Sequence, residues 1–271
     1  MSSVELVRGS PIAYREVLPA AARRDDAVVL LHGFPESSRM WIGAMEALAG
    51  AGFRCLAPDL YALGDSRGFG AATFEHSLER FGEWIDSLDL ERLALVVHDW
   101  GGFVGLAWAC ENPARIASLA ISDTGFFADG KWHGMAEALR GDGGEQLIDA
   151  LDRDGFTALL NSSDEIFDPE DVDAYWEPFA DGRGQVATLQ FYRSMDFEKL
   201  APYEGGLAAI GAPTLLLWGR DDPFAPLAGA KRLEREIPGS ELVALDAGHF
   251  VFDERPRESV EALVGFLSNT P

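Results

Sequence analysis

The stretch Leu93-Ala-Leu-Val-Val97-His98-Asp99-Trp100-Gly101-Gly102 runs from five apolar residues through a polar pair to two glycines, and apolar residues at helical spacing follow at 103–111. This succession predicts a buried strand, a sharp turn and a helix, with Asp99 at the centre of the turn. Such a turn strains its central residue and needs small neighbours two positions away. Gly101 meets that need fully and Val97 only in part. We therefore expect Asp99 to be presented at the end of a central strand.

The sequence on both sides of this turn alternates in the same way. Buried parallel strands are predicted at residues 27–31, 53–57, 116–121, 213–218 and 241–245, and helices at residues 40–49, 74–88, 228–236 and 256–267. Alternation of this kind predicts an α/β fold in which helices flank both faces of a mostly parallel sheet.

The alternation is interrupted between residues 124 and 212. Short amphipathic helices are expected there at residues 146–160, 171–179 and 185–195, separated by glycine-rich breaks. We interpret residues 124–212 as a helical cap that is inserted into a core made of residues 1–123 and 213–271.

The charge of the chain excludes two classes of partner. Lysine and arginine number 22 and aspartate and glutamate 45, so the formal net charge is −23. Such a surface repels nucleic acid and anionic membranes, and we expect neither as a partner. No apolar run is long enough to predict a membrane span, and no metal-ligand spacing occurs, so we expect no metal and no cofactor.

The two cysteines indicate the compartment. Cys55 falls in a predicted strand and Cys110 in a predicted helix, so buried thiols are expected rather than a disulfide. Residues 1–20 lack the basic start and apolar stretch of a signal peptide. A cytoplasmic location is therefore expected, and the oligomeric state stays open between a monomer and a homodimer.

The chemistry that suits Asp99 is attack on carbon. A carboxylate at the start of a helix is stabilised as an anion by the helix N-terminus. Attack on a saturated, polarised carbon would give an ester that water hydrolyses with a histidine as base. An acyl intermediate would instead be a labile anhydride, which argues against an ordinary serine-type esterase reaction. The alternative is that Asp99 only caps the helix.

Two further segments bring polar groups to the same edge of the predicted sheet. The loop in Leu30-Leu-His-Gly-Phe-Pro35 carries the backbone N–H of Phe34, which together with that of Trp100 would form an oxyanion hole. His249 follows the last strand, in the chain order nucleophile, acid, histidine, and is predicted to be the general base. The loop could instead be a simple turn, and His249 could instead have a structural role.

Two aspartates could orient that histidine. Asp222 follows the strand at residues 213–218 and is preferred, and Asp123 follows the preceding strand and stays open as the second candidate. Either could instead be a turn-forming or capping residue.

With these residues assembled, the chain resembles the α/β-hydrolase family that contains epoxide hydrolases and hydrolytic dehalogenases, from Val28 to Leu267. The resemblance rests on His32-Gly-Phe-Pro-Glu36, His98-Asp-Trp-Gly-Gly102 and Asp246-Ala-Gly-His-Phe250. It implies an Asp99–His249–Asp222 triad. Glu36 would either position water or cap the next helix.

The resemblance also implies roles in the cap. Phe191-Tyr-Arg193 is similar to the epoxide hydrolase segment that carries one of two ring-opening tyrosines, which makes Tyr192 the best donor to the epoxide oxygen. The other tyrosine is absent between residues 125 and 160, where Trp132-His133 resembles members that use a histidine instead. We therefore expect His133 as the second donor.

The resemblance leaves other functions open. In a haloalkane dehalogenase the indole N–H of Trp100 would hold the halide, but that branch carries Asn or Glu where Phe34 stands here. A haloacid substrate is disfavoured because Trp100 and Phe103 occupy positions that are arginine in fluoroacetate dehalogenases. A third possibility is an inactive member of the fold that binds a small molecule.

Aromatic residues of the cap region favour a small apolar substrate, with water as the second reactant. They are Phe126, Phe127, Trp132, Trp176, Phe179 and Phe191. Each could instead belong to the core of the cap.

Overall fold

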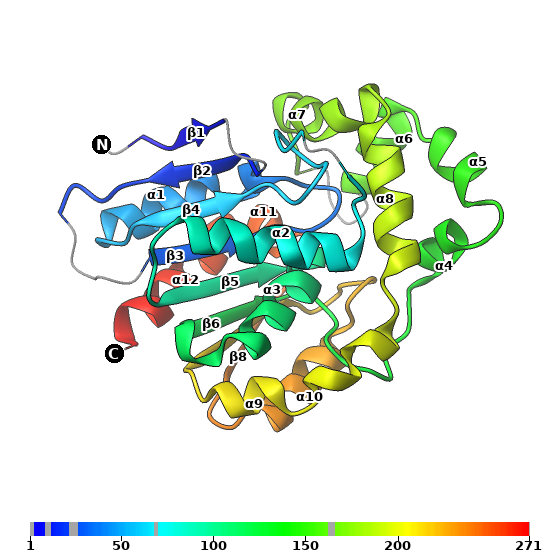
Figure 1. Cartoon of the computed structure of the whole chain (residues 1–271). Coiled ribbons are helices and arrows are strands. Elements are labelled where there is room, and N and C mark those ends of the chain that lie inside the picture. Colours follow the sequence, from blue (N-terminus) through cyan, green and yellow to red (C-terminus); the bar gives the residue numbers. More distant parts are fainter. Residues whose placement is uncertain (1–2, 9–11, 22–26, 68–69, 162–165, 271) are drawn as a thin grey trace.

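The computed structural model describes residues 3–8, 12–21, 27–67, 70–161 and 166–270, and these contain one sheet in the order β1-β2-β4-β3-β5-β6-β7-β8 (Figure 1). The strands are β1 (Glu5–Val7), β2 (Tyr14–Val17), β3 (Ala27–Leu31), β4 (Cys55–Pro58), β5 (Leu93–His98), β6 (Ile116–Ser122), β7 (Thr214–Gly219) and β8 (Glu241–Leu245). Pairing is parallel from β4 through β8, whereas β2 pairs antiparallel with both β1 and β4. The predicted mostly parallel sheet is confirmed.

The central strands are the apolar runs that the sequence shows. Every residue of β3, β5 and β7 is buried, as expected of parallel strands covered on both faces. The strands β1 and β2 are short and not fully buried, and apolar and polar residues do not alternate regularly in their sequences. That is why the sequence did not predict them.

Helices cover the two faces of the sheet with separate apolar cores. On one face lie α1 (Ile42–Gly50), preceded by η1 (Ser38–Trp41), with α11 (Val251–Glu254) and α12 (Pro256–Asn269). On the other lie α2 (Phe74–Ser87), α3 (Trp100–Glu111) and α10 (Leu227–Glu236), with η2 (Pro113–Arg115) before β6. The five helices predicted outside residues 124–212 are confirmed, to within three residues at each end.

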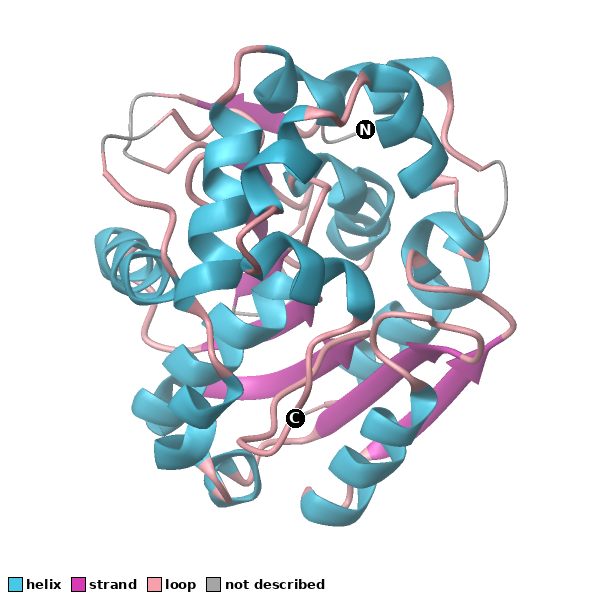
Figure 2. Cartoon of the chain, turned by 90° about the vertical axis from the view of Figure 1, so that its right-hand side faces the viewer, coloured by secondary structure: helices cyan, strands magenta, loops and turns pink. Residues whose placement is uncertain are grey.

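Between β6 and β7 the chain forms a group of short helices beyond the ends of the central strands (Figure 1). They are α4 (Gly134–Arg140), α5 (Gly144–Asp149), α6 (Arg153–Leu160), α7 (Pro169–Ala180) and α8 (Arg183–Ser194). The chain then returns through η3 (Phe197–Tyr203) to α9 (Gly206–Ile210), which packs against α3 of the core. Figure 2, viewed from the side of this group, shows helices in front of and around the strands. We propose that residues 124–212 are a cap on a core made of residues 1–123 and 213–271.

One prediction in this segment is wrong. The sequence pattern predicts a single helix at residues 146–160, but the structure breaks it into α5 and α6. The break falls at Asp152, whose side chain accepts a hydrogen bond from the Gly155 N–H and so caps α6. An aspartate at an N-cap competes with continued helix, and apolar spacing alone does not reveal it.

No helix in the described ranges is long and apolar enough to cross a membrane.

Candidate active site

Asp99 lies in the turn between β5 and α3 with φ 47° and ψ −117°, a conformation that side-chain-bearing residues rarely adopt. Close packing around the turn requires glycine. A Cβ on Gly101 would lie 2.4 Å from the carbonyl oxygen of Leu31, and one on Gly105 would lie 2.7 Å from Cγ1 of Val97. Gly105 therefore makes room for Val97, the neighbour that the turn accommodates less easily.

The two oxygens of the Asp99 carboxylate have different surroundings. Its Oδ1 accepts a hydrogen bond from the Phe34 N–H at 2.8 Å, and the Trp100 N–H also hydrogen-bonds the carboxylate. Its Oδ2 lies 3.7 Å from Nε2 of His249. Burial raises the pKa of Asp99, while the positive charge of His249 and the two N–H groups oppose that rise. One oxygen is thus held by the backbone and the other faces the imidazole.

His249 is oriented by Asp222. Its Nδ1 lies 2.9 Å from Oδ2 of Asp222, and the other Asp222 oxygen accepts the N–H groups of Phe224 and Ala225. Burial alone would lower the pKa of His249, but the carboxylates of Asp222 and Asp99 outweigh it and raise the pKa to about 9. The imidazole is held in one orientation, with Nε2 toward Asp99.

Asp123 is buried nearby, with different partners. Its two oxygens accept hydrogen bonds from the Ser122 hydroxyl at 2.6 Å and from the Gly219 N–H at 2.9 Å. Burial and the charge of Asp222 raise its pKa. Because Asp222 and not Asp123 pairs with Nδ1 of His249, the geometry favours Asp222 as the orienting acid.

Tyr192 comes from α8 and lies against Trp100. The phenol ring meets the rings of Trp100 and Trp132 edge-on, at centroid distances of 4.9 and 5.2 Å. Burial raises the pKa of Tyr192 well above its ordinary range, the Asp99 charge adds to this, and the Trp100 indole opposes it. The hydroxyl therefore keeps its proton near neutral pH and is suited to donate.

His133 stands at the N-cap of α4, with its ring 6.1 Å from that of Tyr192 and 4.9 Å from that of Phe224. Burial and the charge of His249 lower the pKa of His133 to about 4. Its Nδ1 accepts a hydrogen bond from the Ala136 N–H at 3.4 Å, which leaves Nε2 to carry the proton of the neutral ring.

Two cavities meet at Asp99. The smaller, of about 10 Å³, is lined by Phe34, Pro35, Asp99, His133, Met135, Leu159, Tyr192, Phe224, His249 and Phe250. The larger, of about 240 Å³, is lined by Asp99, Phe103, Thr124, Gly125, Phe127, Gly130, Lys131, Trp132, His133, Phe197, Phe224, Ala225, Pro226, Ala228 and Gly229. The structure thus brings Asp99, His249, Tyr192 and His133 to one chamber.

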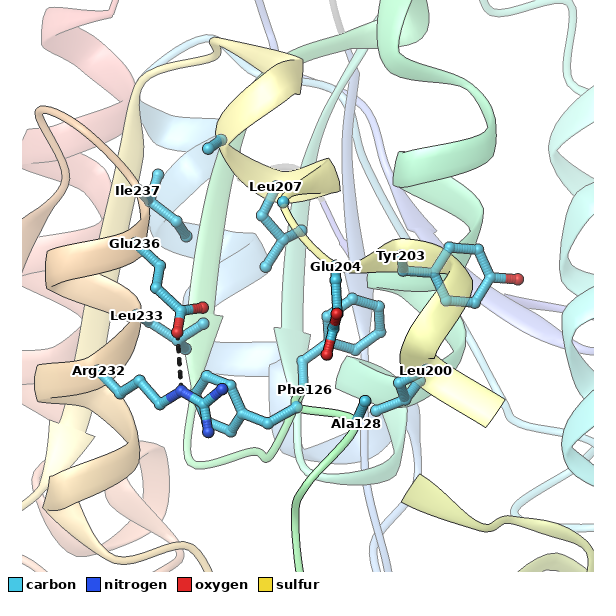
Figure 3. A pocket seen from close by; sticks show the side chains of 13 residues that line it. Phe126, Ala128, Leu200, Tyr203, Glu204, Leu207, Arg232, Leu233, Glu236 and Ile237 are labelled. Carbon is cyan, nitrogen blue, oxygen red and sulfur yellow. Dashed lines mark hydrogen bonds and ion pairs between the residues drawn. The ribbon is translucent and has the colours of Figure 1, made fainter. Parts of the chain in front are cut away.

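A separate cavity of about 390 Å³ lies between α10 and the segment formed by η3 and α9 (Figure 3). Arg232 and Glu236 form an ion pair along its wall, and Glu204 faces them from the opposite side. It contains none of the site residues predicted from the sequence.

A buried acidic cluster lies behind His249. Glu36 Oε2 is 3.5 Å from Nε2 of His98, whose ring centroid is 4.9 Å from that of His249, and the Glu36 carboxyl interacts electrostatically with that of Asp253. Burial raises the pKa of both carboxyls, so the pair retains a proton. The helix-capping interpretation of Glu36 is wrong, because Ser37 caps η1. Sequence reasoning missed Asp253, which no local motif marks.

No group of three or more histidine, cysteine, aspartate or glutamate side chains in the described part of the chain is arranged to hold a metal ion.

Comparison with known proteins gives the family of this chain. The family model of the alpha/beta hydrolase fold matches residues 26–256, so the chain belongs to the α/β-hydrolase fold family. It is 29% identical to epoxide hydrolase 3 of Siraitia grosvenorii over 85% of this chain and 88% of that protein. It is 27% identical to the haloalkane dehalogenase of Psychrobacter cryohalolentis over 94% of this chain and 87% of that protein.

Among solved structures, the DbeA-M1 loop variant of a haloalkane dehalogenase from Bradyrhizobium elkanii is similar with a TM-score of 0.83. The match covers 100% of this chain and 97% of that one at 24% identity, and it shows the shared fold. The chain is therefore an α/β-fold hydrolase, close to the epoxide hydrolases and haloalkane dehalogenases.

Proposed function

We propose that this protein is an epoxide hydrolase that opens an apolar epoxide to a vicinal diol through an ester of Asp99. The observation that carries the proposal is the composition of the smaller cavity. Asp99 and His249 line it together with two hydrogen-bond donors, Tyr192 and His133. Opening an epoxide needs this combination, because a nucleophile must meet carbon while a donor meets the ring oxygen.

In the first step Oδ2 of Asp99 attacks a ring carbon. The carbon–oxygen bond of the ring breaks, its electron pair passes to the ring oxygen, and the Tyr192 hydroxyl transfers its proton there. The neutral His133 ring gives a second hydrogen bond through Nε2. The Phe34 N–H holds Oδ1 and the Trp100 N–H also hydrogen-bonds the carboxylate, so that the attacking oxygen is presented in one direction.

In the second step water attacks the ester carbonyl of Asp99. His249 takes a proton from the water, and the Asp222 carboxylate, which accepts a hydrogen bond from Nδ1–H, stabilises the imidazolium. The same two N–H groups stabilise the oxyanion that forms on Oδ1. Esterification removes the charge of Asp99, one of the charges that raise the pKa of His249, so the base is more readily neutral when it is needed. The tetrahedral intermediate then collapses: the bond between the carbonyl carbon and the ester oxygen breaks, and the diol oxygen leaves with the remaining proton of the attacking water. The proton held by His249 returns to the Tyr192 phenolate, and Asp99 is again a carboxylate.

The decisive test is isotopic. We expect a single turnover of excess enzyme with styrene oxide in H₂¹⁸O to give unlabelled diol and to leave ¹⁸O in the Asp99 side chain, read by mass spectrometry of the peptide. Asp99→Asn should form no ester. Label in the diol after a single turnover would show direct attack by water and contradict the proposal.

The second candidate is a haloalkane dehalogenase with the same triad. It is favoured by one observation, that the indole N–H groups of Trp100 and Trp132 are buried and have no acceptor at hydrogen-bond geometry among the described residues. Against it, the Phe34 ring stacks on Trp100 at 4.9 Å, where that branch carries a polar side chain. Bromide release from 1-bromobutane without diol formation from styrene oxide would favour this candidate. An inactive, ligand-binding member would do neither.

We also propose a cellular location for the enzyme and two classes of partner that it does not bind. We place the protein in the cytoplasm, because both cysteines are free thiols whose pKa burial raises to about 12, which suits a reducing compartment. We propose neither nucleic acid nor membrane as a partner, on the grounds of charge. A measurement of the mass of the protein in solution will distinguish a monomer from a homodimer.

A further inference from the structure

The two cavities that meet at Asp99 differ greatly in size. A cavity needs a volume of about 10–15 Å³ to hold one water molecule. The smaller cavity, at about 10 Å³, therefore has room for about one water-sized group. Because the proposed donors Tyr192 and His133 both line it, that group is the ring oxygen of the epoxide.

The larger cavity has the character of an apolar slot. Along one wall the rings of Phe103, Trp132 and Phe197 contact each other, with centroid distances from 4.9 to 5.7 Å. The small residues Ala228 and Gly229 at the start of α10 also line the slot. The volume of about 240 Å³ compares with about 10 Å³ for the smaller cavity, so only the larger one can hold the substituent of a substrate.

The slot leads from the nucleophile to solvent. Asp99 lines its inner end, while Lys131 and Ala228, which also line it, are exposed. The cation of Lys131 is thus placed where water solvates it. A chain longer than the slot could extend past these residues.

We propose, building on the epoxide hydrolase function, that the substrate is a terminal epoxide with one unbranched or flat apolar substituent, which occupies the slot while Asp99 attacks the unsubstituted ring carbon. Met135 and Leu159 line only the smaller cavity and exclude a substituent on the attacked carbon. They are the specificity-determining residues, and configuration at the substituted carbon is retained.

The first experiment compares substrates with the unchanged protein. We expect kcat/KM for 1,2-epoxyhexane to exceed that for trans-2,3-epoxyhexane by roughly 10- to 100-fold, the usual penalty for forcing an extra group into a packed site. Over many turnovers in H₂¹⁸O, label should appear on C1 of the diol. Equal rates on the two epoxides, or label mainly on C2, would overturn this inference alone, whereas hydrolysis of neither epoxide would contradict the proposed function.

The second experiment alters each cavity separately. Met135→Ala and Leu159→Ala should each lower the preference for the terminal over the internal epoxide by several-fold, and either variant suffices if the other does not fold. Ala228→Trp should raise KM for 1,2-epoxydecane far more than for 1,2-epoxypropane. Leu147→Ala, at an exposed position of α5, is the control. It should change neither the preference for the terminal over the internal epoxide nor the ratio of the KM values for 1,2-epoxydecane and 1,2-epoxypropane. Unaltered ratios in both small-cavity variants would show that these residues do not set the specificity.

Discussion

At the scale of single residues, the site depends on which of two aspartates forms the hydrogen bond to His249. Asp222 and Asp123 are both buried near His249, but Asp222 contacts Nδ1 whereas Asp123 is satisfied by Ser122 and Gly219. Sequence order allows either to be the orienting acid, and the hydrogen bonds distinguish between them.

We expect Asp222→Asn to lower kcat by about 10³- to 10⁴-fold, because an amide neither fixes the tautomer of His249 nor stabilises its cation. Asp123→Asn keeps the shape of the side chain, and kcat should fall by less than roughly 10-fold. Steady-state kinetics of the two matched variants checks this. If Asp123→Asn is the more damaging, the roles of the two aspartates are reversed.

The buried pair of Glu36 and Asp253 should make stability depend on pH. Burial raises the pKa of Asp253 from 3.8 to about 7. The folded state then holds a proton that the unfolded state has lost, so this group's contribution to stability falls as pH rises between these values. Asp253→Asn retains a neutral donor toward Glu36 and should raise the free energy of unfolding at pH 8 by roughly 1–3 kcal/mol.

Urea denaturation at pH 5 and pH 8 measures this effect, with the exposed Asp149→Asn as control. The gain for Asp253→Asn should be larger at pH 8. A gain that is equal at the two pH values would show that Asp253 ionises normally.

At the scale of elements, the turn from β5 into α3 carries the nucleophile and depends on close backbone packing. A Cβ on Gly101 would lie 2.4 Å from Leu31 O and 2.7 Å from His32 O, and neither carbonyl belongs to a flexible side chain. The strained conformation of Asp99 is thus maintained by contacts from the neighbouring strand β3 and its loop.

Gly101→Ala should therefore destabilise the protein by at least about 2–3 kcal/mol, because the backbone has to move to admit the methyl group. The matched control is Gly43→Ala in α1, where a Cβ meets nothing within 4 Å and helix propensity predicts a gain of about 0.5–1 kcal/mol. Thermal unfolding of the two variants gives the comparison. Equal stability of Gly101→Ala and the unchanged protein would mean that the turn is not tightly packed.

At the scale of the whole molecule, the net charge of −23 acts on the folded state through self-repulsion. Added salt shortens the screening length from about 30 Å at 0.01 M to about 8 Å at 0.15 M. We expect Tm to rise by several degrees between these NaCl concentrations, as measured by calorimetry at pH 7.5. A Tm that falls or stays constant would indicate that the ion pairs between surface arginines and carboxylates outweigh the repulsion.

The positions of the six parallel strands along the chain, the turn at Asp99 and the two-sided covering of the sheet were determined by the sequence alone. Each depends on signals within about ten residues, such as a continuous apolar run or a glycine two positions after the nucleophile. The local pattern failed at Asp152, where a capping side chain interrupts the helix despite the apolar spacing. It also failed in the short strands β1 and β2, where apolar and polar residues do not alternate regularly.

Only the tertiary structure decided how the site is assembled. His249 lies 27 residues from Asp222 and 126 from Asp123, and no local signal tells which of them it meets. The acidic partner of Glu36 and the unequal cavities on the two sides of Asp99 likewise arise from segments far apart in the chain. Distances and volumes between remote segments follow from packing, and packing is a property of the assembled fold rather than of any stretch of sequence.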